Sequence, residues 1–308
     1  MKYAIAIDLG ATNMRVALGN EKGKILVKLK ERTVQKGDKH SVACQMLRMI
    51  ASITEKHTVS IAGVGIASLG PLDLKKKAIV HPANLSYNII DLKPLKKTGR
   101  KIFLLHETSA AVLGEKTFGA GKKLVNVVYV TLSSGIGTGA IVDGNLLSGI
   151  DGNAGELGHM NIDTHYNFLC SCKKGRGHWE AYASGKNMGR FFKHWLKENN
   201  INKPSFKAES KTIFNAAKNG NKTALKFLND VGKLNAKALS NIIVAYSPEL
   251  ITLGGSEALY HSKLILEPIK KYVDTFLKKP KIMITPLGED VVLLGVLAAV
   301  FSQKGSRL

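Results

Sequence analysis

One group of residues that could do chemistry begins at Asp8, directly after a short apolar run. Gly10 permits a positive φ and a close approach of the backbone, so the amides around Ala11 can face a phosphate group. The side chains of Thr12 and Asn13 can add hydrogen-bond donors. Asp8 is a candidate partner for Mg²⁺, held through water. An ordinary hairpin turn uses the same residue types, so the segment indicates a phosphate site only together with others.

A second turn rich in small residues repeats this chemistry between Thr131 and Gly139. Three glycines alternate with other residues there, and Thr131, Ser134 and Gly135 are the candidates for contacting phosphate. Two turns of this kind could hold opposite ends of a triphosphate. A Gly-rich stretch taken alone is still a weak signal.

Gly254 and Gly255 follow another short apolar run, at residues 250–253. A nucleoside could pack against such a flat stretch of backbone. The alternative is a loop that enters a helix, with Ser256 as the N-cap.

A possible metal site comes from Cys170 and Cys172, which are separated by one residue and preceded by His159. Thiolate and imidazole groups in such a pattern suit tetrahedral Zn²⁺. The alternative is two free thiols and surface histidines. With Cys44 the chain has 3 cysteines, too few for a disulfide framework.

These residues need a mixed α/β framework to position them. Apolar alternation and turn signals predict strands over residues 3–9, 14–19, 24–29, 60–67, 101–105, 125–132, 140–142, 250–253 and 281–285. Helical spacing of apolar residues predicts helices over 41–56, 109–117, 290–301 and most of 180–246. The strand–turn–strand opening recurs at 125–142, which fits two related α/β domains facing a cleft. The length of 308 residues also suggests two domains.

The chain carries a formal net charge of +22, which can serve nucleic acid, membrane or anionic substrates. Its lysines are scattered, however, and no long basic run is interleaved with aromatic residues. We therefore interpret the charge as a solvated surface and do not expect a nucleic-acid partner. The first apolar run is too short for a signal peptide, and none approaches the roughly 18 residues of a membrane helix. A soluble, cytoplasmic protein with no membrane partner is expected.

Taken together, these motifs resemble the ROK family of sugar kinases and repressors, within the actin-like ATPase superfamily, over essentially the whole chain. The most family-specific segments are Gly155–His159 and Cys170–Cys172 followed by Gly177–Ala181. Gly63–Asp73 resembles the family's sugar-side loop, and Pro82–Leu85 follows it.

The resemblance implies the two-domain actin-like (ribonuclease H-like) α/β fold, with sugar and ATP bound in the cleft between the domains. The N-terminal α/β domain would comprise residues 1–115 plus the C-terminal helix at 290–308. The C-terminal α/β domain would comprise residues 116–289, with the zinc-type loop and a helical region. Homodimers are usual in the family, so a homodimer is expected.

The resemblance also assigns Glu156, His159 and Glu180 to contacts with sugar hydroxyls. Carboxylates can accept hydrogen bonds from hydroxyls, and an imidazole bound to a metal keeps one nitrogen to offer the sugar. Ser68 and Asn84 are expected on the opposite wall. Taken singly, each of these residues could also be a solvated polar group on the surface.

The sequence does not determine which residue is the fourth zinc ligand. Family members usually have a third cysteine where this chain has His178, which can also bind Zn²⁺. One extra residue, beside a pair of lysines, separates Cys172 from His178. The metal would be structural and would hold the loop that carries His159 and Glu180 beside the sugar.

The main departure from the family lies at His106 and Glu107, where the family pattern begins Asn-Asp. The family aspartate is the general base for the sugar 6-hydroxyl, and Glu107 is a carboxylate one methylene longer. A base must lie about 2.6–3.2 Å from its proton donor, and a 1 Å misplacement can cost on the order of 100-fold. Either the backbone compensates, or the enzyme is slow, or hexoses are no longer phosphorylated. His106 replaces an amide that is expected to bind sugar hydroxyls.

The implied function is ATP-dependent phosphorylation of a hexose or N-acetylhexosamine at its 6-hydroxyl. Glucose, mannose, N-acetylglucosamine and N-acetylmannosamine all stay open as substrates. One rival is a sugar-responsive repressor; family repressors carry a helix-turn-helix domain before the first phosphate turn, and none is expected before Asp8. The other is a regulatory sugar-binding protein with weak or lost catalysis. The changes at His106 and Glu107 favour that rival, whereas Gly10 and Thr12 count against it.

Overall fold

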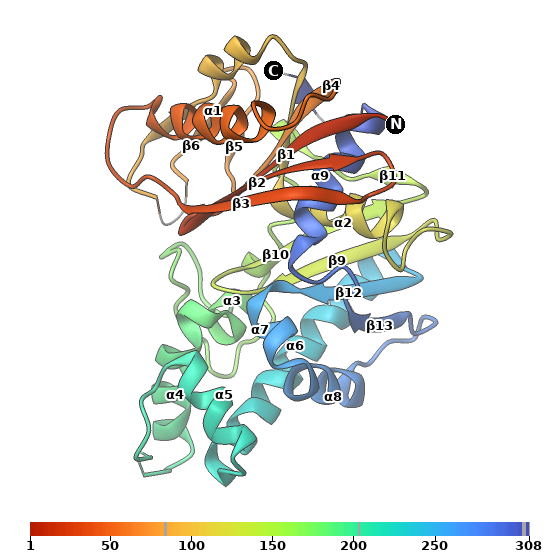
Figure 1. The fold of residues 1–308 in the computed structure, drawn as a ribbon. Coiled ribbons are helices and arrows are strands. Elements are labelled where there is room, and N and C mark those ends of the chain that lie inside the picture. The colour runs from red at the N-terminus through yellow and green to blue at the C-terminus, as the bar shows by residue number, and fades with distance from the viewer. Residues whose placement is uncertain (83–84, 203, 304–305, 308) are drawn as a thin grey trace. The chain divides into compact units, whose positions relative to one another are not determined.

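The computed structural model describes residues 1–82, 85–202, 204–303 and 306–307. The chain divides into two compact units (Figure 1). Unit 1 contains Met1–Lys123, Asn145–Gly155 and Asp290–Leu308, and unit 2 contains Leu124–Gly144 and Glu156–Glu289. Residues 116–123 and 145–155, which the sequence-based division gave to the C-terminal domain, belong to unit 1.

Local hydrogen bonds explain this difference from the predicted boundaries. The amide of Gly121 donates to the carbonyl of Glu115 (3.0 Å), which keeps the end of the preceding helix and the following turn together. The side chain of Asn153 both donates to and accepts from the backbone of Leu72, at 3.0 and 2.8 Å. Neither the short-range contact of Gly121 nor the long-range contact of Asn153 leaves a signal in hydrophobic periodicity.

The described residues of unit 1 form a mixed sheet, a small antiparallel sheet and three α-helices. In chain order they are β1 (Tyr3–Leu9), β2 (Asn13–Asn20), β3 (Ile25–Arg32), α1 (Ser41–Thr54), β4 (Ile61–Ser68), β5 (Leu72–Asp73), β6 (Ala78–Val80), β7 (Ile89–Asp91), the 3₁₀ helix η1 (Lys93–Thr98), β8 (Ile102–His106), α2 (Glu107–Thr117), β11 (Asn145–Leu146), η2 (Ile150–Gly152), α9 (Val291–Ser302) and β14 (Ser306–Arg307).

The main sheet of unit 1 has the strand order β14-β8-β4-β1-β2-β3. Strand β1 pairs with β2 antiparallel and with β4 parallel, and β4 pairs with β8 parallel. The carboxyl ends of β1, β4 and β8 therefore meet at one edge of the sheet. This is the edge where α/β sheets usually bind ligands.

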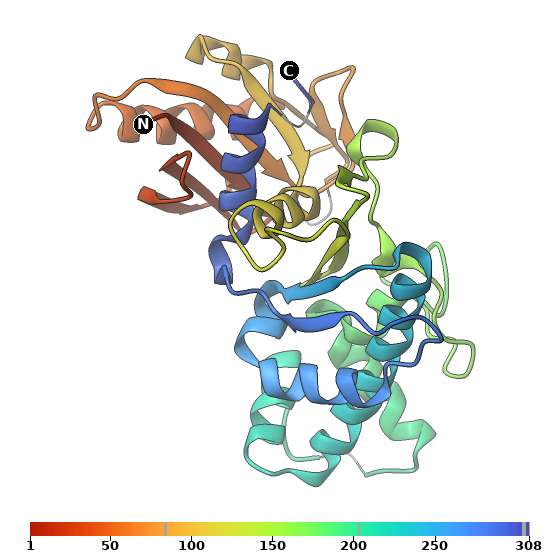
Figure 2. The same cartoon turned by 90° about the vertical axis from the view of Figure 1, so that its right-hand side faces the viewer.

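The two faces of this sheet are covered differently (Figures 1 and 2). On one face, alternate side chains of β1 such as Ile5 and Ile7 share a buried cluster with α1. On the other face, α9 comes very close to the strands: a Cβ at Gly65 would lie 2.4 Å from the side chain of Val296. Helix α2 packs on α9 equally closely, because Gly295 faces the carbonyl of Ala110. Small residues thus set the spacing on the α9 face.

Unit 2 contains a second mixed sheet and most of the helices. Its elements are β9 (Val127–Leu132), β10 (Ile136–Val142), η3 (Leu157–His159), α3 (Trp179–Ala183), α4 (Gly185–Glu198), α5 (Ser210–Lys218), α6 (Lys222–Tyr246), β12 (Leu250–Gly254), α7 (Gly255–Tyr260), α8 (Ser262–Tyr272) and β13 (Lys281–Ile284), followed by η4 (Gly288–Asp290). Strands run in the order β10-β9-β12-β13. Strand β9 is antiparallel to β10 and parallel to β12.

Aromatic side chains form much of the core of unit 2. Trp179, Tyr182, Phe191 and Phe227 are all completely buried. The rings of Tyr182 and Phe191 meet edge to face at 4.8 Å, and those of Phe191 and Phe227 lie 5.6 Å apart. The indole of Trp179 donates to Asn235 Oδ1 of α6 at 2.7 Å. The short helix α3 is thereby fixed to the long helix α6.

The predicted strands and helices are confirmed in type, with shifts at their ends. The predicted recurrence is also confirmed, because β1–β2 and β9–β10 are both antiparallel hairpins whose first strand has a parallel neighbour. The strand predicted at 140–142 already begins at Ile136, so Gly137 and Gly139 pair within it. Helix α7 begins at Gly255 with Gly254 as its N-cap, and the alternative cap at Ser256 is wrong.

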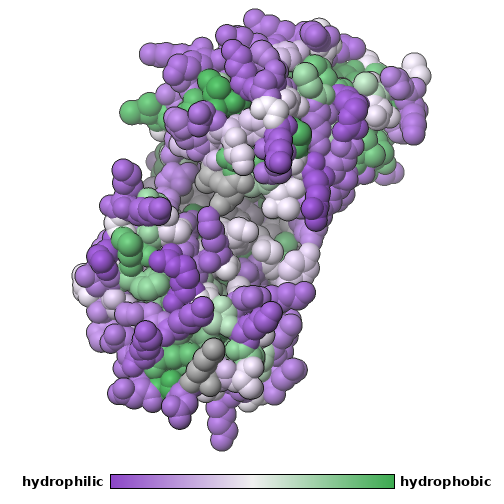
Figure 3. Space-filling model, turned by 90° about the vertical axis from the view of Figure 1, so that its left-hand side faces the viewer, coloured by the Kyte–Doolittle hydropathy of each residue, from purple (hydrophilic) through white to green (hydrophobic). Residues whose placement is uncertain are grey.

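No helix within the described ranges has the length and apolar composition needed to cross a bilayer. Figure 3 shows one face of the molecule, where hydrophilic side chains predominate and hydrophobic ones form small groups between them. Such a mixture of hydrophilic and scattered hydrophobic side chains is ordinary for a protein surface.

Candidate active site and metal cluster

The first small-residue turn connects β1 to β2. The amide of Gly10 donates to the carbonyl of Asn13 at 3.1 Å, and a Cβ on Gly10 would lie 2.9 Å from that carbonyl oxygen. Gly10 does not have a positive φ. Close approach of the backbone, and not a left-handed conformation, is therefore the reason for glycine here.

The carbonyls of this turn are bound by residues that follow β3. Thr33 Oγ1 donates to the carbonyl of Gly10 at 2.7 Å, and Gln35 Nε2 donates to that of Ala11 at 2.8 Å. A trans peptide places its carbonyl and its N–H on opposite sides. The amides of Ala11 and Thr12 consequently point away from Thr33 and Gln35, as a phosphate-binding turn requires.

Asp8 is buried at the end of β1 and already contacts a cation. Arg15 lies opposite it on β2, and its Nε donates to Asp8 Oδ2 at 2.9 Å. Asp290 also belongs to this group of charged side chains. Its Oδ1 is 3.8 Å from an Arg15 nitrogen and 2.6 Å from Lys28 Nζ. A magnesium ion held through water would have to use the other oxygen of Asp8.

Three predicted residues of unit 1 lie at the ends of neighbouring parallel strands. Ser68 ends β4 and is in register with Leu9 of β1 and with His106 of β8. Its hydroxyl donates to the carbonyl of Leu69 at 2.9 Å. Glu107 follows His106 directly as the half-buried first residue of α2. Asn84 lies outside the described residues.

His106 has a clear local role at this edge. It is buried and is the N-cap of α2, where its Nδ1 accepts from the amide of Thr108 and lies 2.8 Å from the Thr108 hydroxyl. The imidazole also lies against Gly70, since a Cβ there would be 3.3 Å from Nε2. His106 therefore fixes the start of α2, and with it the backbone of Glu107.

The second small-residue turn is restricted to Ser133–Gly135, between β9 and β10. Thr131 at the end of β9 is in register with Gly254 of β12. Gly255 has a φ of +83°, and a Cβ on it would lie 2.5 Å from the carbonyl oxygen of Leu132. The structure therefore brings the predicted nucleotide residues of unit 2 together.

The start of α4 also belongs to this region, although no sequence motif predicted it. The amide of Gly185 donates to the carbonyl of Ser133 at 2.8 Å, and that of Lys186 donates to Ser134 at 3.3 Å. The two serines are thus held by the first two residues of a helix. In the sequence, Gly185 after Ser184 is the one feature that could have indicated this contact, and a single glycine matches no known motif.

The predicted sugar residues of unit 2 lie beside the second turn and the metal cluster. Glu180 Oε2 accepts from the amide of Ile136 at 3.0 Å, directly after Gly135. Glu156 is exposed and precedes η3, which ends at His159. The carbonyl of Glu156 accepts from the amide of His159 at 3.0 Å.

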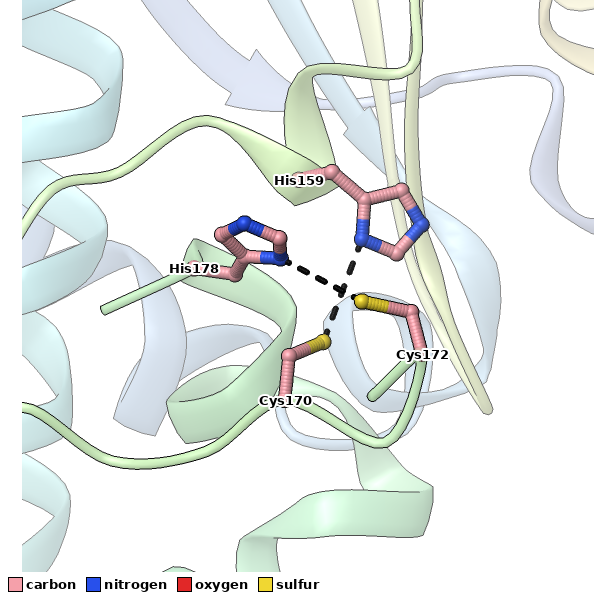
Figure 4. A group of neighbouring side chains, drawn as sticks. All are labelled: His159, Cys170, Cys172 and His178. Atoms are coloured by element: carbon pink, nitrogen blue, oxygen red, sulfur yellow. Dashed lines mark hydrogen bonds between the residues drawn. The ribbon is translucent and has the colours of Figure 1, made fainter. Parts of the chain in front are cut away.

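His159, Cys170, Cys172 and His178 form a cluster in which one ligand atom of each lies within 4.8 Å of the others (Figure 4). Cys170 Sγ lies 3.9 Å from His159 Nδ1, and Cys172 Sγ lies 3.5 Å from His178 Nδ1. Two thiols and two imidazoles that converge in this way could hold a metal ion. The donor set is one that tetrahedral Zn²⁺ prefers.

The extra residue between Cys172 and His178 is taken up by a tight loop. The amide of Lys173 donates to the carbonyl of Cys170, and the amide of Cys170 donates to the carbonyl of Gly175, both at 3.0 Å. Lys173 has a φ of +59°. A Cβ on Gly175 would lie only 2.2 Å from His178 Nε2. Glycine at this position lets the His178 imidazole reach the cluster.

Burial shifts the pKa values of two residues in this cluster. It raises the pKa of the Cys170 thiol to about 11, and it lowers the pKa of His178, with a further contribution from His159. A neutral imidazole is ready to bind a metal, whereas a thiol must first lose its proton. The four residues fit Zn²⁺ in donor type and convergence.

Comparisons with known proteins agree with this geometry. The ROK family profile matches residues 4–302. A glucokinase from Pyrobaculum calidifontis is 35% identical over 303 residues, covering 97% of this chain and 95% of that protein. The structure of a ROK hexokinase from Thermus thermophilus matches with a TM-score of 0.81 and 26% identity, covering 98% of this chain and 99% of that one.

A ROK family glucokinase from Streptomyces griseus, solved with glucose and AMPPNP, matches with a TM-score of 0.77 and 25% identity, covering 98% of this chain and 100% of that one. The mixed α/β fold predicted from the sequence is confirmed by these likenesses. With a family profile that spans almost its whole length, this chain belongs to the ROK family.

Proposed function

We propose that this chain is an ATP-dependent sugar kinase that transfers the γ-phosphoryl group to the 6-hydroxyl of a hexose or N-acetylhexosamine. The observation that carries the proposal is the pair of small-residue turns, each at the carboxyl end of a strand with a parallel neighbour. A protein that only bound sugar would have no use for two phosphate-binding turns. The glucokinase relatives and the relative solved with glucose and AMPPNP support the same reaction.

The turns supply the groups that bind the triphosphate. In unit 1 these are the amides of Ala11 and Thr12, with the side chain of Asn13 beside them. In unit 2 they are Thr131, Ser134 and Gly135, while Gly254 and Gly255 offer flat backbone to the nucleoside. Backbone donors fixed in this way stabilise charge in phosphoryl transfer without having to reorganise.

Magnesium would be held by Asp8 through water, and when bound it would neutralise charge on the phosphates. The hydrogen bond from Arg15 Nε orients the Asp8 carboxylate for this role.

Glu107 is the proposed general base that accepts the proton of the sugar hydroxyl. Its backbone is fixed by the cap that His106 places on α2. The longer side chain is the feature that separates this site from the aspartate of the family pattern.

The sugar hydroxyls would be bound by Glu156, His159 and Glu180 from unit 2 and by Ser68, Asn84 and His106 from unit 1. In His159 the Nδ1 atom faces Cys170, which leaves Nε2 for the sugar. Zn²⁺ in the His159, Cys170, Cys172 and His178 cluster would be structural and would fix the orientation of this imidazole. The protein would form a homodimer, as is usual in the family. It would act in the cytoplasm, where ATP is available.

The test is ADP release from Mg-ATP with glucose, mannose, N-acetylglucosamine and N-acetylmannosamine as acceptors. We expect turnover that depends on one or more of these sugars and falls about 10²–10⁴-fold in Glu107→Gln, since general base catalysis contributes that much. Sugar and nucleotide affinities should stay close to those of the wild-type protein.

Glu107→Asp tests whether the backbone has adapted to the longer side chain of glutamate or whether its carboxylate is misplaced. If the backbone has adapted to glutamate, the aspartate variant will be slower than the wild-type protein; if glutamate is misplaced, the variant will be faster. Saturable sugar binding without turnover for any sugar would instead support the regulatory sugar-binding protein.

A further inference from the structure

The second phosphate turn is held by residues that continue directly from the metal cluster. Residues 178–186 begin at the cluster residue His178 and then contact this turn in succession. Glu180 accepts from the amide of Ile136 at 3.0 Å, Gly185 donates to the carbonyl of Ser133 at 2.8 Å, and Lys186 donates to the carbonyl of Ser134 at 3.3 Å. The contacts of this segment thus cover both ends of the turn.

The other histidine of the cluster touches the same place. Gly158 directly precedes His159, and a Cβ on Gly158 would lie 2.2 Å from the carbonyl oxygen of Ile136. The amide of Ile136 is therefore bonded to the segment that begins at His178, and its carbonyl packs against the segment that carries His159. A displacement of either histidine would be transmitted to Ile136.

Hydrogen bonds also connect the two histidine-bearing segments to each other. The amide of Trp179 donates to the carbonyl of Met160 at 3.0 Å, and Asn161 and His178 form an antiparallel bridge. The indole of Trp179 is anchored on Asn235. The cluster, both segments and the turn thus form one continuous structure within unit 2.

We propose that the metal cluster sets the geometry of the second nucleotide-binding turn, and that Glu180 is the positioning residue that connects the two. One oxygen of Glu180 holds the amide of Ile136, and the other remains to contact the sugar, so the residue serves both substrates. This inference rests on the proposed function. It predicts that bound metal increases the affinity for nucleotide.

Coupling between two binding sites is reciprocal, so nucleotide must increase the affinity for metal by the same factor. This gives a measurement that does not depend on catalysis. Zn²⁺ release to a chromogenic chelator is followed with and without Mg-AMPPNP, and the Kd of Mg-AMPPNP is measured by calorimetry with zinc-loaded and zinc-free protein. We expect both affinities to change by the same factor, about 10-fold, as for other groups that orient a metal site.

Two variants of Glu180 separate its two roles. Glu180→Gln keeps an oxygen that can accept from the amide of Ile136, so the coupling between Zn²⁺ and Mg-AMPPNP should persist while glucose binding weakens. Glu180→Ala removes the acceptor, so glucose binding should weaken and the coupling should become much smaller, with the zinc content unchanged. Even if the zinc-free form does not fold, comparing these two variants in zinc-loaded protein tests whether Glu180 connects the metal cluster to the turn.

The outcomes distinguish this inference from the proposed function. Equal Mg-AMPPNP affinity with and without zinc, in folded protein, would overturn the inference and leave the kinase proposal intact. Full coupling in Glu180→Ala would overturn the role of that residue. Zinc-loaded wild-type protein that binds no Mg-AMPPNP at all would overturn the proposed function itself.

Discussion

The two turns that we propose bind phosphate have the same local construction, but different residues hold them. Each follows a strand with an antiparallel and a parallel neighbour, and each contains a glycine where the backbone comes close to another atom. The first turn is held by Thr33 and Gln35, which follow the next hairpin of the same sheet. The second is held by the 178–186 segment and by Gly255, from distant parts of the chain.

The hairpin and its turn are thus repeated in both units, whereas the residues that hold each turn differ. The first turn needs only the early strands of unit 1 to form. The second turn contacts the start of α4 and the segment that begins at the cluster residue His178. Its stability should therefore respond to changes that leave the first turn unaffected.

The largest effect is expected from Gly255→Ala in the second turn region. The left-handed φ of +83° costs a non-glycine residue about 1–2 kcal/mol. The new Cβ, 2.5 Å from the carbonyl of Leu132, adds about 1–3 kcal/mol of overpacking. We expect the free energy of unfolding in urea to fall by about 2–5 kcal/mol.

Gly10→Ala is the matched change in the first turn. Gly10 has no positive φ, and its Cβ would meet a single backbone oxygen at 2.9 Å. The loss should be smaller, about 1–2 kcal/mol. An equal or larger loss at Gly10 would break the comparison between the two turns.

An intermediate effect is expected from Trp179→Phe. The change removes the hydrogen bond to Asn235 Oδ1 and leaves a buried acceptor unpaired, which costs about 1–3 kcal/mol of unfolding free energy. Because Trp179 lies between His178 and Glu180, Mg-AMPPNP affinity should fall as well. Thermal unfolding and calorimetry measure the two effects.

Trp195→Phe is the control for this change. Trp195 is equally buried and donates to Asp230 Oδ2 at 3.1 Å, but it lies outside the 178–186 segment. It should lose similar stability with unchanged nucleotide affinity. A fall in nucleotide affinity in both variants would mean that general loosening of unit 2, and not this segment, controls the turn.

The smallest effect is expected from Thr33→Val, which removes the hydrogen bond to the carbonyl of Gly10 with little change of shape. We expect a loss of about 1 kcal/mol and a Mg-AMPPNP affinity a few-fold lower, with the same change in zinc-loaded and zinc-free protein. Thr138→Val in β10 is the control, because the buried Thr138 hydroxyl has no partner among the described residues. A stability loss in that variant as large as at Thr33 would show that the measurement does not report the Gly10 hydrogen bond.

Much of the framework could be predicted because it depends on local patterns. The β1 and β9 hairpins follow from apolar runs interrupted by small residues, and α9 follows from a continuous apolar segment that starts at Val291. Strands β5 to β7 were not predicted, since runs of two or three residues have no periodicity. The start of β10 was placed too late because Gly137 and Gly139 resemble a loop in sequence but pair with β9.

The sequence by itself determined the chemical groups: two small-residue turns, a carboxylate at position 107, and thiols and imidazoles that suit a metal. It could not decide whether His178 reaches the cluster, because that depends on how the loop at Lys173 and Gly175 folds. It also could not show that Glu180 holds Ile136. The ring position of His178 depends on how the neighbouring backbone turns, and Glu180 lies 44 positions from Ile136, so only the folded chain brings these atoms close together.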